Sequence, residues 1–124
     1  MGTMMENFRV FEVRDPSGKI WKVAFQWLQT AISIRHSDSV DVKFSLSCGD
    51  AGMEKVIALP HPALLALSAK GNRPLSDPWC VRLAALHLTH MIETETDMDK
   101  RLVTVAAEEL AVYSRSLEAS APAA

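Results

Sequence analysis

Several features that would point to a function are missing from this sequence. Lysine and arginine form no cluster, and the formal net charge is −2. Proteins that bind nucleic acid usually carry a basic patch that displaces counterions from phosphates, so we expect no nucleic-acid partner. No apolar run approaches the ~18 residues of a membrane span, and the N-terminus lacks the basic-then-apolar layout of a secretory signal. We therefore expect a cytoplasmic protein without a membrane partner.

Cysteine and catalytic motifs are also scarce. The 124 residues include two cysteines, Cys48 and Cys80, which are too few for a disulfide framework and are expected to be reduced thiols. The sequence contains no P-loop, no G-x-G-x-x-G and no G-x-S-x-G. Enzymatic activity is left open, its absence is favoured, and no cofactor is implied.

The composition is that of an ordinary globular domain. Hydrophobic residues make up 48% of the chain and charged residues 23%. A chain of this length can bury a core without crosslinks, so we expect a single domain over residues 1–124. Residues 1–6, a leader, and residues 119–124, a tail of small residues, are expected to be disordered.

The first half of the chain reads as strands. Residues 8–14 are rich in β-forming side chains, and Asp-Pro-Ser-Gly at 15–18 predicts a turn. The run 19–27 alternates and predicts a half-buried strand that pairs with the first as a hairpin. One face of this second strand is expected to carry Trp21, Val23, Phe25 and Trp27.

The strands that follow differ in clarity. Residues 28–35 suit either a strand or a helical turn, and we favour the strand. Residues 40–48 alternate most clearly, with Val40, Val42, Phe44, Leu46 and Cys48 on one face. Gly-Asp-Ala-Gly at 49–52 then reverses the chain into a strand over 54–59. The short connections require antiparallel neighbours, and the alternation requires one covered and one solvated face.

The second half reads as helices. Pro-His-Pro at 60–62 ends the last strand, and a short helix over 63–70 is expected to end at Gly71 in a left-handed conformation. A long helix spans 76–95, and another begins near 106. Residues 102–105 suit either a strand or the start of that helix. We predict an α+β fold, a four- to five-stranded antiparallel meander followed by two or three helices packed on one face of the sheet.

The 76–95 helix carries the residues best suited to binding. His87 and His90 lie about 60° apart around the helix axis and could ligate one metal, and Glu93 extends the spacing to H-x-x-H-x-x-E. His61 and Cys80 could join them if the short helix packs alongside. The H-E-x-x-H pattern is absent, so hydrogen-bonded histidines on an amphipathic helix are the favoured interpretation.

Three further features of the sequence could take part in binding or catalysis. Trp79 suits the core and an interface equally. Cys80 lies two turns from His87, about 10 Å along the axis, which is too far for a thiol and its base to share a hydrogen bond. An acidic stretch at 93–99 could hold a hard cation, although a solvated linker is favoured. Its carboxylates stand at alternate positions, Glu93, Glu95, Asp97 and Asp99.

Two hypotheses of function follow from the sequence. The first is a protein-interaction or structural module that binds a protein partner or forms a homodimer through the 76–95 helix, whose apolar arc is wider than one sheet requires. The alternative is a small-molecule or metal-binding protein, which could be an enzyme, with a site around His87 and His90 and with Glu93 and Trp79 as further candidate binding residues.

Overall fold

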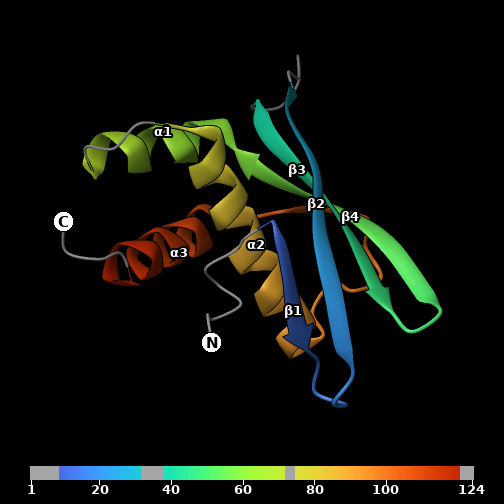
Figure 1. Cartoon of the computed structure of the whole chain (residues 1–124). Coiled ribbons are helices and arrows are strands. Elements are labelled where there is room, and N and C mark those ends of the chain that lie inside the picture. Colours follow the sequence, from blue (N-terminus) through green and yellow to red (C-terminus); the bar gives the residue numbers. More distant parts are fainter. Residues whose placement is uncertain (1–8, 32–37, 72–74, 121–124) are drawn as a thin grey trace.

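A computed structural model describes residues 9–31, 38–71 and 75–120. Of the segments expected to be disordered, 1–6 and 121–124 lie outside the described residues, whereas residues 119 and 120 are helical. Of residues 28–35, for which we favoured a strand over a helical turn, 28–31 are extended and 32–35 lie outside the described residues. The elements in chain order are β1 Val10–Arg14, β2 Ile20–Ala31, β3 Ser39–Cys48, β4 Ala51–Pro60, α1 His61–Lys70, α2 Asp77–Thr94, β5 Leu102–Thr104 and α3 Ala107–Ser120 (Figure 1).

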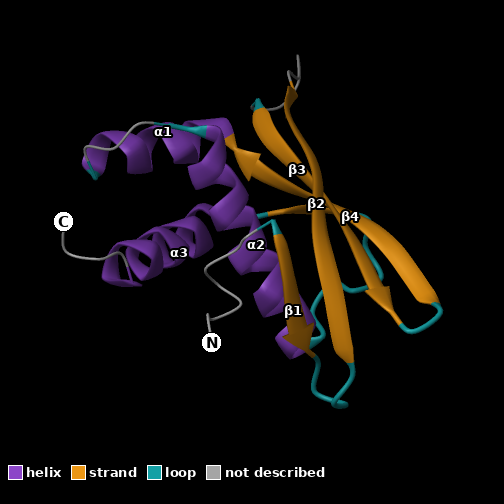
Figure 2. Ribbon diagram, in the orientation of Figure 1, coloured by secondary structure: helices purple, strands orange, loops and turns teal. Residues whose placement is uncertain are grey.

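The strands form one five-stranded sheet in the order β1-β2-β3-β4-β5, and all three helices lie on one side of it (Figure 2). This confirms the predicted α+β fold. The first four strands are antiparallel neighbours, as their short connections require. Residues 102–104, which suited either a strand or a helix, form the strand β5. This strand runs parallel to β4, not antiparallel as in the predicted meander. The reason is that α1 and α2 intervene and return the chain to the end of the sheet where β4 began.

The two hairpins of the meander rest on turn residues that the sequence signalled. Gly18 and Gly49 both adopt positive φ, 93° and 60°, which glycine reaches without strain. The carboxylate of Asp15 accepts hydrogen bonds from the amides of Ser17 and Lys19 and from the indole of Trp21. These bonds hold the first turn against the start of β2.

The face predicted for Trp27, the last residue of the alternating run in β2, is wrong. Phe25 pairs with Phe44 and Trp27 pairs with Lys43, so Gln26 is an extra residue without a partner in the ladder. Such a bulge moves every later side chain to the opposite face. Trp27 therefore lies on the side away from the helices, and Leu28, opposite Val42, takes its place on the covered side.

The helix ends follow local chemistry with one exception. The Ser76 hydroxyl accepts a hydrogen bond from the amide of Trp79 at the start of α2, and Pro78 occupies the first turn. Glu95 ends α2 in the left-handed conformation. Gly71 ends α1 as predicted, but with φ −88° rather than a positive φ, because its amide closes onto the carbonyl of Leu67 as in a continuing helical turn.

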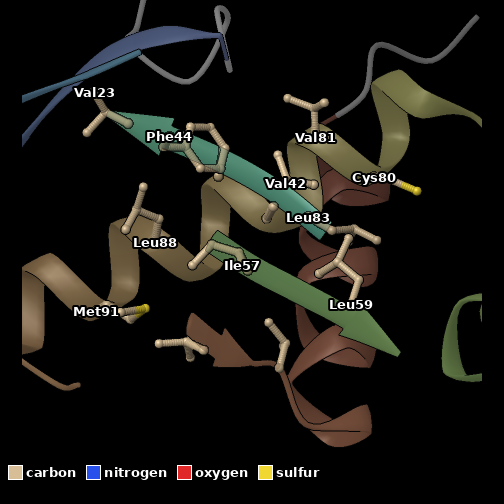
Figure 3. Packing of buried hydrophobic residues seen from close by; sticks show 14 of the residues in the cluster. Val23, Val42, Phe44, Ile57, Leu59, Cys80, Val81, Leu83, Leu88 and Met91 are labelled. Atoms are coloured by element: carbon tan, nitrogen blue, oxygen red, sulfur yellow. The ribbon is translucent and has the colours of Figure 1, made fainter. Parts of the chain in front are cut away.

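The core lies between the covered face of the sheet and α2, whose apolar side chains reach toward β3 and β4 (Figure 3). The helix α2 also contacts α3 on another of its sides, and α3 in turn contacts α1. The wide apolar arc of α2 is therefore covered within the chain. Its buried residues are Trp79, Cys80, Val81, Leu83, Ala84, Ala85, His87, Leu88, Met91 and Ile92.

None of the helices in the described ranges is long and apolar enough to span a membrane.

Candidate functional site

Polar side chains from α2 and α3 meet in a hydrogen bond where the two helices pack together. His87 is only 4% exposed, and its Nδ1 shares a hydrogen bond of 2.8 Å with the hydroxyl of Tyr113. A carboxylate oxygen of Glu109 lies 3.8 Å from the same nitrogen. We call His87, Tyr113 and Glu109 the polar cluster. Because Glu109 and Tyr113 are one turn apart on α3, both reach the same histidine.

Burial dominates the electrostatics of this cluster. It lowers the pKa of His87 below the usual 6.5, although the charges of Glu109 and Asp97 act in the opposite direction and His90 adds to the lowering. Burial, followed by the negative charge of Glu109, raises the pKa of Tyr113 to about 12. At neutral pH the imidazole and the phenol are therefore both uncharged, which suits a buried hydrogen bond between helices.

The sequence-predicted binding residues are only partly brought together. The rings of His87 and His90 lie 6.4 Å apart, but His87 faces α3 and His90 is exposed. Glu93 is exposed near the end of α2, and Trp79 is buried near its start, about 20 Å away by the rise of a helix. No group of three metal-binding side chains occurs within the described residues.

Two surface clefts in the described part of the chain lie away from the polar cluster. One lies between α1 and α3, and the other lies beside Trp21, Met53 and Met98. Because His87 is only 4% exposed, it lacks the access that a general acid or base needs. The thiol of Cys80 is also unsuited to nucleophilic attack, because burial raises its pKa to about 11, with a further contribution from Asp77.

The acidic stretch after α2 does hold a cation, but with its backbone. Lys55 lies on the covered face of β4, opposite Phe44, and is 2% exposed. Its ammonium donates hydrogen bonds to the carbonyls of Asp97, Met98 and Lys100, at 3.4, 2.8 and 2.5 Å. An ammonium has three N–H groups, so these carbonyls satisfy it completely.

The burial of Lys55 also affects its titration. Desolvation lowers its pKa, and the nearby charges of Asp99 and Asp97 partly oppose that effect. Sequence reasoning missed this arrangement, because position 55 reads as one polar residue near the start of an apolar strand. A lysine inside an alternating pattern, followed far downstream by an acidic loop, is the one signal that could have suggested it.

The sheet face turned away from the helices, which we call the open face, carries an apolar row. Cross-strand pairing places Trp27 opposite Lys43, Lys43 opposite Val56 and Val56 opposite Leu102. Trp27 is 36% exposed and Leu102 is 58% exposed. The Lys43 ammonium lies 5.7 Å from the centre of the Trp27 ring and 3.0 Å from Glu54. We call Trp27, Val56 and Leu102, together with Lys43, which lies between Trp27 and Val56, the apolar row.

Sequence reasoning missed the apolar row because it required the bulge at Gln26 and the parallel strand β5. The alternating pattern of β2 continues through Trp27, and nothing in the residue types marks the extra residue. Leu102 joins the row only because β5 pairs with β4. Tyr113 and Glu109 were missed for a similar reason, since their meeting with His87 depends on how α3 packs against α2.

Acidification is expected to destabilise the protein through His87. Its pKa is lowered in the folded state, so the unfolded chain binds the proton more readily between pH 6.5 and the lower folded value. The stabilisation is therefore fully present above pH 6.5 and is lost as the pH falls toward the folded pKa. Urea unfolding from about pH 8 to about pH 5 measures this loss.

The variant His87→Asn tests the assignment, because it keeps a polar atom near the position of Nδ1 but does not titrate. It should lack that part of the pH dependence, whereas His90→Asn, a change at an exposed ring, should retain it. An unaltered pH profile in His87→Asn would show that another group is responsible.

Comparison with known proteins finds no relative: no family model matches the chain, and no curated protein or solved structure matches it significantly.

Proposed function

We propose that this chain is a non-enzymatic interaction module that binds a second copy of itself through the open face of its sheet. The observation that carries the proposal is the apolar row, which places Trp27 and Leu102 in solvent on the open face. Exposed apolar side chains on one face mark interaction sites, and tryptophan is enriched at the centre of protein interfaces.

The packing of α2 favours this surface over the one proposed from sequence. Self-association through the 76–95 helix relied on apolar surface that the sheet alone would leave free. In the folded chain α3 covers that side of α2, and the polar cluster joins the two helices. The apolar residues available for a partner are therefore better sought on the open face.

The charges of the open face support a second copy as the partner. Acidic and basic side chains alternate there in equal number, so two copies related by a two-fold axis can align opposite charges. The same balance offers no basic patch for nucleic acid. The acidic residues of this face are Glu12, Asp41 and Glu54, and the basic residues are Arg14, Lys22 and Lys43.

The size of the face is adequate for a stable dimer. The strands are 5, 12, 10, 10 and 3 residues long. At about 4.8 Å between strands and about 3.4 Å per residue they cover roughly 650 Å² before the relief of side chains is counted. Stable interfaces bury about 800 Å² per partner, so the whole face would take part. The two free cysteines, Cys48 and Cys80, suit the reducing cytoplasm that we propose as the location.

The alternative of a small-molecule or metal site at His87 and His90 has less support. His87 is buried against Tyr113, and the polar cluster lines neither of the two clefts. Elemental analysis of protein purified without a nickel column tests the metal directly.

Sedimentation velocity or light scattering over a concentration series tests the proposed self-association. We expect a concentration-dependent dimer that is weakened at least tenfold by the double change Trp27→Glu and Leu102→Glu, because four added charges would face each other across the two-fold interface. The matched control is Leu65→Glu, a change at an exposed leucine on α1.

Two outcomes would contradict the proposal. One is a monomer at high micromolar concentration, and the other is a dimer that survives the double change. Circular dichroism on the same samples establishes that the double variant remains folded, as expected for substitutions at exposed positions.

A further inference from the structure

A groove of about 410 Å³ runs between α1 and α3, on the helical side of the molecule and remote from the open face. Each helix lines it with residues at positions i, i+3 and i+4, which lie along one helical face. From α1 these are Leu67, Lys70 and Gly71, and from α3 they are Ala111, Ser114 and Arg115.

The charge of the groove has one sign. Lys70 and Arg115 line it, both are exposed, and no acidic residue is among the described lining residues. Within the described ranges neither cation forms an ion pair. Lys70 lies in the last turn of α1, where it also interacts with the negative end of the helix dipole. Arg115 has no such interaction and is the stronger anion-binding group.

The side chain of Ser114 also lines the groove, although the residue as a whole is only 6% exposed. Its hydroxyl makes no hydrogen bond to any described residue, and it is not among the buried unpaired atoms, so it is open to the groove. An accessible hydroxyl without a protein partner can pair with a ligand that enters the groove. Leu67 and Ala111 supply the apolar surface beside it.

We propose that this groove binds a small aliphatic carboxylate. The carboxylate would accept hydrogen bonds from Ser114 and Arg115, with Lys70 adding charge, and the aliphatic chain would lie against Leu67 and Ala111. The volume is within the range of small-molecule sites, about 300–1,000 Å³, and exceeds what a simple inorganic anion fills. A groove selected for charge alone would not need an apolar floor.

Octanoate is a suitable probe, and backbone amide shifts of isotope-labelled protein report where it binds. We expect saturable shifts in residues 67–71 and 111–115. Octylammonium, which has the same chain and the opposite charge, should bind at least fivefold more weakly, and acetate, which has the charge without the chain, should not saturate. Equal binding of octanoate and octylammonium would overturn the proposal.

Substitutions in the groove test whether octanoate binds there. The double change Lys70→Gln and Arg115→Gln should weaken octanoate binding about fivefold or more, whereas Arg101→Gln, a matched change at an exposed arginine outside the groove, should leave it unaltered. Ala111→Trp should block binding by filling the groove. Octanoate shifts that persist in either groove variant would overturn the proposal. This test does not depend on association through the open face.

Discussion

Replacing Lys55 with methionine should lower the free energy of unfolding by about 3 kcal/mol, because three carbonyls of one loop lose their donor at once. Methionine keeps most of the aliphatic stem that lies on the covered face opposite Phe44, so the loss reports the ammonium rather than the packing. The carbonyls belong to the loop that leads from α2 into β5. Chemical denaturation measures the change, and residues 97–104 should lose hydrogen-exchange protection first.

The matched control for this prediction is Lys100→Met. Lys100 forms an exposed ion pair with Asp97 at 3.3 Å, and such pairs contribute about 0.2–1 kcal/mol. The two lysines thus lie at the same loop and differ mainly in burial. If Lys55→Met costs no more than Lys100→Met, the ammonium is not what secures the loop.

Replacing Phe44 with alanine should cost about 4 kcal/mol, the range seen when a fully buried aromatic side chain is removed. Phe44 is completely buried at the centre of β3. Its ring makes edge-to-face contacts with Phe11 and Phe25, each at 6.2 Å between centroids. Such contacts add about 0.5–1.5 kcal/mol beyond the buried area. Thermal and urea unfolding of the variant give the value.

Phe25→Ala is the comparison, because Phe25 shares one of these contacts but is only partly buried. We expect it to cost about 2 kcal/mol. A loss for Phe44→Ala no greater than that for Phe25→Ala would mean that the core can collapse around position 44.

The meander could be predicted because its information is local. In β3 the buried residues Val40, Val42, Phe44 and Leu46 alternate with more exposed ones, and such a pattern has one solution when a single face is covered. The same is true of the α2 start, where Ser76 and Pro78 act within one turn. These features depend on neighbours in sequence, so composition and spacing suffice to find them.

The features that could not be predicted depend on contacts between distant segments. Trp27 changes face because a bulge shifts its register against β3, and Lys55 is buried because a loop more than 40 residues later supplies its acceptors. The candidate site followed the same rule. His87 was identified from its helix, but its partner Tyr113 comes from α3. Sequence spacing therefore located one member of the polar cluster and not the others.

The parallel pairing of β4 with β5 has a consequence for the order of folding. The hairpins β1–β2 and β3–β4 close over tight turns, whereas α1 and α2 lie along the chain between Val56 and its partner Leu102. The entropic cost of closing a chain segment rises with its length, so this contact is among the slowest to form. The apolar row, which we propose as an interface, is therefore complete only when β5 has paired with β4.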